Sequence, residues 1–196
     1  WSYPPASSIQ LKEEKSTGYE YGLEFLARDT VRAEFIFFDQ EINDAIYFDL
    51  AGYSGYLQES GKSKSTGLEF NGSYILSDSL VFQANYTYND TERPNGAQRL
   101  RRPEQLSNIG INYQSESGKL RLNSFYRISK NSIDERFGAL IDLDDFEVLD
   151  ISMSYQVTSE IEVFARIENV FDEKYQEVIG YLTPRRGSYL GFRISI

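Results

Sequence analysis

Three closely spaced arginines are the residues of this sequence best suited to bind a charged group. They are Arg99, Arg101 and Arg102, within the stretch Gln98-Arg99-Leu100-Arg101-Arg102-Pro103. A guanidinium presents a planar fork of donors that matches a carboxylate or a phosphate. The stretch therefore predicts a contact with an anionic group on a ligand or a neighbouring molecule. Alternatively, the three arginines bind nothing and simply carry charge at the base of a solvated loop.

Acidic residues are the second group that could do chemistry. The run Asp142-Leu143-Asp144-Asp145 and the spaced acids within 39–49 could attract calcium, which prefers clustered carboxylates. Neither segment has the loop spacing of a known calcium motif, so solvated loops are the preferred interpretation. Glu162 and Glu168 form a carboxylate pair on the polar side of a predicted strand. Solvation explains that pair without glycosidase chemistry.

Several classes of function are excluded by what the sequence lacks. It contains no cysteine and no histidine, which removes disulfide frameworks, Cys/His zinc sites, thiol nucleophiles and histidine-based triads. The net charge of -10 argues against nucleic-acid binding, which requires a basic face. We therefore expect neither an enzyme nor a resident cofactor.

Aromatic residues are abundant although the chain is polar on average. There are 15 Tyr, 13 Phe and 1 Trp, and the mean hydropathy is -0.48. No segment approaches the roughly 18 consecutive apolar residues of a membrane helix. This combination predicts strands with alternating apolar and polar residues, the pattern of transmembrane β-strands.

Alternation with a period of two predicts nine strands. In the segment 80–88, for example, Leu80, Phe82 and Ala84 share one face, while Gln83 and Asn85 share the other. The segment from Val31 is less regular because Phe35-Ile36-Phe37-Phe38 is apolar on both faces. The predicted strands are 19–25, a strand from 31, 68–74, 80–88, 109–113, 119–128, 149–156, 161–168 and 190–196.

The connections alternate between short and long. Tight polar turns are predicted at 28–30, 77–79, 115–118 and 158–160, and long connections at about 41–63, 90–104, 130–146 and 172–186. Outer-membrane barrels have short periplasmic turns and longer extracellular loops. The rhythm therefore favours an antiparallel transmembrane β-barrel in the outer membrane of a Gram-negative bacterium. A soluble antiparallel sandwich, which also alternates, is the competing interpretation.

An odd number of strands points to a segment of a barrel, because single-chain bacterial barrels have even strand numbers. The first predicted strand starts at the outer side and the last ends at the periplasmic side. We expect part of a barrel wall rather than a closed pore.

The C-terminal region resembles the end of TonB-dependent receptors. Glu168-Asn169-Val170-Phe171-Asp172-Glu173-Lys174-Tyr175 is similar to the family's Asn-Leu-Phe-Asp-x-x-Tyr signature. Further similar elements are Gly180-Tyr181, Pro184-Arg185-Arg186, Leu11-Lys12-Glu13-Glu14-Lys15-Ser16, Gly67-Leu68-Glu69 and Leu100-Arg101-Arg102-Pro103. Their order and spacing most resemble the vitamin B12 (cobalamin) receptor subfamily. Glu13 stands where the family has Pro, and Arg185 where it has Gly.

The resemblance implies that residues 1–196 are the C-terminal portion of a plugged barrel of 22 strands. Its plug domain, which contacts TonB, and its N-terminal strands would lie outside this chain. Asn169, Phe171, Tyr175 and Arg186 would form the family's C-terminal motif. We expect a structural role for it, with Asn169 and Tyr175 fixing the junction between strand and loop. Substrate contact is the alternative.

The resemblance also implies partners and a function. Phe192 and Ile196 would belong to the signal read by the barrel-assembly machinery, although the family usually ends in an aromatic residue. Lipid and lipopolysaccharide would surround the barrel, and Arg99, Arg101 and Arg102 could contact lipopolysaccharide or the ligand. The expected function is TonB-dependent import of a large scarce nutrient, cobalamin or a ferric siderophore. The alternative is a passive porin-like or structural barrel without TonB coupling.

Overall fold

The computed structural model describes residues 11–49 and 52–195. This part of the chain forms eleven β-strands, and no helix in it is long and apolar enough to cross a membrane. The strands are β1 (Lys15–Ala27), β2 (Val31–Phe48), β3 (Tyr56–Ser77), β4 (Leu80–Glu92), β5 (Gln105–Gln114), β6 (Leu120–Lys130), β7 (Ser132–Arg136), β8 (Ala139–Leu143), β9 (Phe146–Gln156), β10 (Ile161–Glu168) and β11 (Gly187–Ile194).

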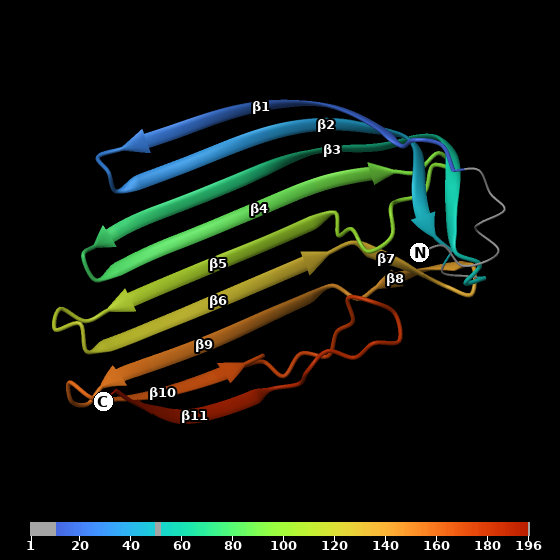
Figure 1. Cartoon of the computed structure of the whole chain (residues 1–196). Helices are drawn as coiled ribbons and strands as arrows, with labels where there is room; N and C mark the ends of the chain where they lie inside the picture. Colours follow the sequence, from blue (N-terminus) through green and yellow to red (C-terminus); the bar gives the residue numbers. More distant parts are fainter. Residues whose placement is uncertain (1–10, 50–51, 196) are drawn as a thin grey trace.

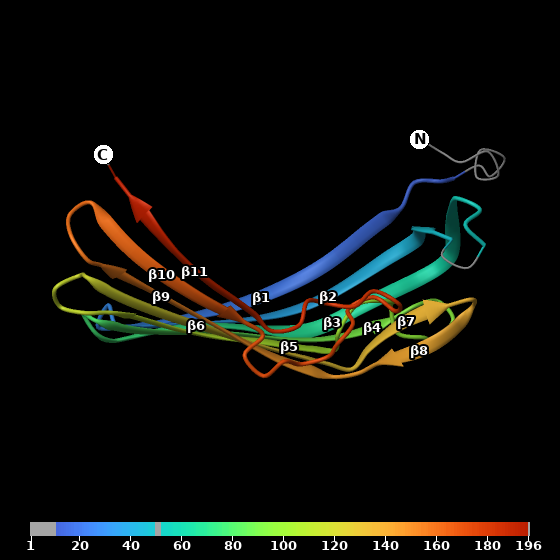
Figure 2. The same ribbon diagram turned by 90° about the horizontal axis from the view of Figure 1, so that it is seen from below.

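Nine of these strands form one antiparallel sheet in the order β1-β2-β3-β4-β5-β6-β9-β10-β11 (Figure 1). Apart from the detour through β7 and β8, each strand pairs with the next one in the sequence. The sheet curves into a trough, as Figure 2 shows. An up-and-down antiparallel sheet of this kind is the wall of a barrel. The predicted nine strands and the all-β fold are confirmed.

The register gives the nine-stranded sheet one mainly apolar face. Phe37 lies opposite Leu68, and Leu68 lies opposite Tyr88. The other face is polar, with Asn71 opposite Asn85 and Asn85 opposite Asn108. We call these the apolar face and the polar face. This two-sided alternation is the one that turns lipid outward and water inward in outer-membrane barrels.

The apolar face has no protein layer over it. Tyr21 and Leu23 of β1 are 71% and 67% exposed, and Phe192 of β11 is 70% exposed. Within the described part of the chain, the buried hydrophobic residues are Leu143, Phe146 and Val148. A soluble sandwich would bury one face of its sheet in a core. The exposure pattern therefore contradicts the sandwich interpretation.

The tight turns lie at one end of the sheet, on the left in Figure 1. In the first of them, Arg28 and Asp29 both have positive φ, 51° and 55°, and the Thr30 amide donates to the Ala27 carbonyl. Two residues of this kind make the tight hairpin turn whose twist suits antiparallel strands. The longer connections lie at the opposite end, as the sequence predicted.

The predicted long connection at 41–63 is wrong in its extent. β2 and β3 stay paired out to Phe48 and Tyr56, so only 49–55 connect them. Alternation is lost here because both faces are wet. Lys62 pairs with Glu41 at 2.8 Å on the side where Phe37 and Leu68 lie lower down. A register shift between Asn43 and Ala45 bends this outer extension.

The predicted loop 130–146 also contains strands. β7 and β8 form a separate two-stranded hairpin at the end with the long connections (Figure 1). Gly138, with φ of 80°, lies in its turn, where an L side chain would be strained. Each strand has five residues, too few for alternation to predict it reliably.

Candidate functional site

Two loops fold over the polar face at the end with the long connections. Thr91, Ser63 and Ser65 belong to the polar face, and all three side chains are buried. The Arg99 amide donates to the Thr91 hydroxyl at 3.1 Å, which places the 93–104 loop over this face. Loops that cover the wet face of a barrel wall narrow its mouth.

The second loop, 169–186, covers the polar face of β6 and β9. The Tyr175 ring stacks on Phe146 with ring centroids 4.1 Å apart. Arg127 donates to the Tyr175 hydroxyl at 3.0 Å and pairs with Glu177 at 2.8 Å. Its guanidinium also lies 5.1 Å from the Phe146 ring centroid. The aromatic stack and Arg127 together fasten this loop to the sheet.

Asp134 joins both loops to the β7–β8 hairpin. Its side chain is fully buried and accepts hydrogen bonds from Arg101 Nε at 2.9 Å, the Ile179 amide at 2.8 Å and the Glu135 amide at 2.8 Å. Burial alone would raise the pKa of Asp134, but the two amides and the Arg101 guanidinium lower it below its ordinary value. The carboxylate is therefore charged and held from three sides.

A cavity of about 620 Å³ lies between the 93–104 loop and the outer end of the β2–β3 hairpin. Tyr47, Phe48 and Leu100 contribute apolar walls, and Arg99 and Arg102 line it as well. Aromatic surface and several charged side chains, four arginines and four acidic residues, thus line the same cavity.

The four arginines that line this cavity differ in their partners. Arg93 makes two hydrogen bonds to Glu59, at 3.2 and 3.1 Å, and Arg101 is held by Asp134. Arg99 and Arg102 form no ion pair with any residue that the structure describes. Burial and the charge of Arg102 lower the pKa of Arg99, while Glu14 opposes the shift. Of the three arginines singled out in the sequence, two are thus unpaired and one is fixed.

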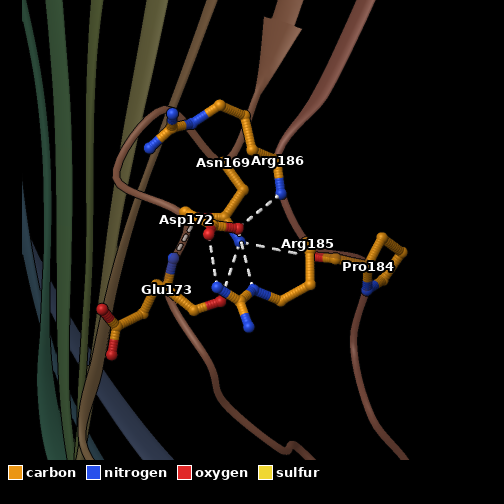
Figure 3. A network of polar contacts seen from close by, with 6 residues as sticks. All are labelled: Asn169, Asp172, Glu173, Pro184, Arg185 and Arg186. Carbon is orange, nitrogen blue, oxygen red and sulfur yellow. Dashed lines mark hydrogen bonds and ion pairs between the residues drawn. The ribbon is translucent and has the colours of Figure 1, made fainter.

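Asn169 ties the end of β10 to its surroundings (Figure 3). The side chain is 4% exposed. Its amide nitrogen Nδ2 donates to the carbonyls of Glu173 at 2.9 Å and Pro184 at 3.3 Å, and Oδ1 accepts from the Glu173 amide at 2.8 Å. The Asn169 backbone amide donates to Asp150 of β9 at 2.8 Å. One side chain therefore bridges both ends of the 169–186 loop.

Asp172 closes the same loop a second time. Arg185 donates to both carboxylate oxygens, and the Arg186 amide donates to Oδ1 at 3.1 Å. The Arg185 guanidinium and the Arg186 amide lower the pKa of Asp172 to about 2. Arg186 thus contributes its backbone here, and Figure 3 shows its guanidinium pointing away from Asp172.

The other residues predicted from the C-terminal motif lie apart from this cluster. Phe171 is 57% exposed and meets Tyr126 of the apolar face edge-on, with centroids 6.5 Å apart. Phe192 lies on the apolar face of β11, and Ile196 lies outside the described residues. Asn169 and Tyr175 share a loop with Arg186, but they contact different partners.

Sequence reasoning missed three residues that organise this end of the sheet: Asp134, Arg127 and Asp172. Asp172 stood inside the recognised motif but was not singled out. Asp134 could have been noticed only as an acid between Ile133 and Glu135 in a short hairpin, which is a weak signal. The acidic segments considered for calcium form no group of three candidate ligands within the described part of the chain.

The fold agrees with a comparison against protein families. A sequence model described as "TonB dependent receptor-like, beta-barrel" matches residues 2–170. The chain belongs to the TonB-dependent receptor family. Membership places it in the outer membrane of a Gram-negative bacterium, and the sheet is a segment of the larger barrel wall of these receptors.

Relatives within the TonB-dependent receptor family are distant and longer. The vitamin B12 transporter BtuB of Vibrio cholerae is 25% identical over 166 residues, covering 78% of this chain and 25% of that protein. BtuB of Photobacterium profundum is 24% identical over 193 residues, covering 95% and 31%. The chain thus spans about a quarter to a third of the curated relatives it matches.

Solved structures of family members share the fold. The Pseudomonas aeruginosa receptor FpvA, in complex with a heterologous pyoverdine and iron, superposes with a TM-score of 0.79 at 18% identity. That match covers 96% of this chain and 28% of FpvA. The copper transporter OprC gives 0.75 at 19% identity, covering 95% and 32%. At these identities the likeness shows the fold alone.

Proposed function

We propose that this chain forms part of the wall and outer mouth of a TonB-dependent transporter. The cargo would be a large scarce nutrient, cobalamin or a ferric siderophore. The observation that carries the proposal is the partly covered polar face: two loops fold over it beside a cavity, while the apolar face is left to lipid. Such a wall suits a ligand path in a water-filled lumen.

The chain itself would be the C-terminal portion of the barrel domain, residues 1–196. Strand direction supports this proposal. β1 and β11 both run toward the end with the tight turns, so they cannot pair with each other in an antiparallel closure. The whole protein would then include further strands, together with a plug domain that contacts TonB. Its surroundings would include lipopolysaccharide, and assembly would use the barrel-assembly machinery.

The family supplies transporters and receptors rather than enzymes, and the relatives named above carry vitamin B12, copper or pyoverdine in their names. From these names we infer that the transporter to which this chain belongs carries cobalamin or a siderophore. A passive porin-like barrel is the competing proposal. It would need no energy from TonB and no loops fastened over its lumen.

Uptake by whole cells tests the proposal. Cells that carry the full-length gene should accumulate labelled cobalamin or a labelled ferric siderophore, and deletion of TonB should abolish accumulation. A gene deletion complemented in trans is the matched control. Uptake that is unchanged without TonB would contradict active transport and favour the passive barrel.

A further inference from the structure

The charges around the 620 Å³ cavity are arranged unevenly. Arg93, Arg99, Arg101 and Arg102 line it, as do four acidic residues, so the formal charges balance. The four arginines and the four acidic residues do not, however, form four ion pairs. Glu59 forms an ion pair with Arg93. Asp134, which is buried, forms an ion pair with Arg101.

Two of the remaining acids are engaged by neutral groups. Glu14 accepts the Ile46 amide at 2.8 Å, and Asp49 accepts the Ser54 hydroxyl at 2.6 Å. Glu135 makes no ion pair within the described residues. Arg99, which is half-buried, and Arg102, which is exposed, therefore form no ion pair within the described residues, and Glu14 is the acid whose charge acts on Arg99.

Two neighbouring cations without an anion between them are unfavourable where water is partly excluded. Burial is the main cause that lowers the pKa of Arg99; the charge of Arg102 lowers it further, and the charge of Glu14 opposes the shift. An oxyanion seated between the two guanidiniums would relieve this repulsion and accept several charge-assisted hydrogen bonds.

Apolar side chains line other parts of the cavity. Tyr47, which lies 5.8 Å from the Arg93 guanidinium, and Phe48 face it from β2, and Leu100 comes from the loop itself. A ligand that fits both sides carries its oxyanion on an apolar or aromatic body. A simple inorganic ion would satisfy only the arginine side.

We propose that this cavity binds a carboxylate- or phosphate-bearing group between Arg99 and Arg102, with the body of the ligand against Tyr47 and Phe48. The group could belong to a soluble ligand or to lipopolysaccharide. The proposal rests on the proposed function only in taking the polar face as the lumenal one. Asp134 is a positioning residue for the site, because it holds Arg101 and so fixes the loop that carries the other two arginines.

Anion binding by the purified full-length receptor tests this inference without TonB. Inorganic pyrophosphate, titrated by isothermal calorimetry in detergent at low salt, should bind the wild type. The double variant Arg99→Gln/Arg102→Gln should bind at least about tenfold more weakly, because two charge-assisted contacts are lost. Arg136→Gln is the matched control: Arg136 lies at the tip of the β7–β8 hairpin, against Phe137, and its loss should leave affinity unchanged.

A charge-preserving variant guards against loss of folding. Arg99→Lys/Arg102→Lys should keep measurable pyrophosphate affinity, and all variants should keep the β-sheet circular dichroism of the wild type. Added lipopolysaccharide separates the two sources: competition with pyrophosphate assigns the oxyanion to the lipid, and lack of competition assigns it to a soluble ligand. Wild-type affinity in the Gln double variant, or an equal loss in Arg136→Gln, would overturn the site. Failure of nutrient uptake alone would leave it standing.

Discussion

Asn169 has a positive φ of 50°, a conformation that asparagine tolerates better than most residues. Its side chain makes three hydrogen bonds while almost fully buried. The sequence predicted that a residue of this motif would fix a strand-to-loop junction, and these contacts support that role. Which carbonyls the amide would reach depends on the path of 173–184, which no short-range pattern specifies.

Replacing Asn169 by Ala should destabilise the full-length receptor by about 2–4 kcal/mol, because three hydrogen bonds are lost and the backbone conformation becomes strained. Asn169→Asp keeps the acceptor and the backbone preference, but it turns a buried carboxylate toward the Glu173 and Pro184 carbonyls, so it should cost at least as much. Guanidinium unfolding of the receptor in detergent micelles measures both. Equal stability of the Ala variant and the wild type would contradict the role.

Asp172 gives the 169–186 loop a dependence on pH. Its pKa is about 2 in the folded protein, below the ordinary value of 3.8. A group with a depressed pKa stabilises the fold above its unfolded pKa and loses that contribution as pH falls. The contacts of Asp172 should therefore hold the loop fully above about pH 4 and weaken as the pH falls from about 4 to 2.

Limited proteolysis of the loop by pepsin, followed across pH 5 to 2, measures this loosening. Asp172→Asn should already be loose at pH 5 and should show a flatter pH profile, since it has no carboxylate to protonate. Glu116→Gln, a substitution in a tight turn at the other end of the sheet, is the matched control. A wild-type profile in Asp172→Asn would refute the explanation.

At the scale of elements, Asp134 links the 93–104 loop, the β7–β8 hairpin and the 169–186 loop. Removing its carboxylate leaves the Ile179 and Glu135 amides without their acceptor and frees Arg101. We expect Asp134→Ala to speed amide exchange in both loops by at least about tenfold, because each lost charged hydrogen bond contributes about 1.5–3 kcal/mol. Hydrogen-exchange mass spectrometry of the full-length receptor measures this.

Asp144→Ala is the control for that experiment, because Asp144 is an exposed acid just beyond the same hairpin. It should leave exchange in both loops unchanged. If Asp134→Ala loosened the hairpin alone, the three elements would not be joined through this carboxylate.

How well each strand could be predicted from the sequence depends on which of its two faces contacts water. β4, β6, β9 and β10 were predicted closely, because lipid on one side and water on the other impose strict alternation. Alternation disappears beyond Asp39 of β2, where Glu41 and Lys62 meet on the side that is apolar lower down. The strands stay paired there through backbone hydrogen bonds, which a pattern of side chains cannot predict. β7 and β8 were missed for a different reason: with five residues each, they are too short for alternation to predict them.

At the scale of the whole molecule, the sheet has two faces but no interior. The curved wall can be stable only with an apolar medium on one side and water on the other. Membership of the family was predictable because the C-terminal motif is contiguous. The arginine cavity was not, since its walls come from β2, β3 and the 93–104 loop, which are distant in sequence.

Two neighbouring positions of β4 test which face meets lipid. Ala84 lies on the apolar face midway along the apolar stretch of its strand, opposite Gly72 and Ile109. Gln83 lies on the polar face, opposite Ser73 and Gly110. An arginine at the bilayer midplane costs about 2–4 kcal/mol on the lipid side of a barrel, whereas lumenal substitutions are tolerated.

Ala84→Arg should therefore lower the free energy of unfolding of the full-length receptor in lipid vesicles by about 2–4 kcal/mol. Gln83→Arg should lower it by less than about 1 kcal/mol, because the guanidinium remains in water. Guanidinium titration in vesicles, read by the gel shift between folded and unfolded forms, measures both on the same scale. The reverse ranking would mean that the polar face meets lipid, and the lumenal placement of both loops and of the arginine cavity would then be wrong. Because the two positions are adjacent, differences in strand propensity or depth cannot produce a gap of that size.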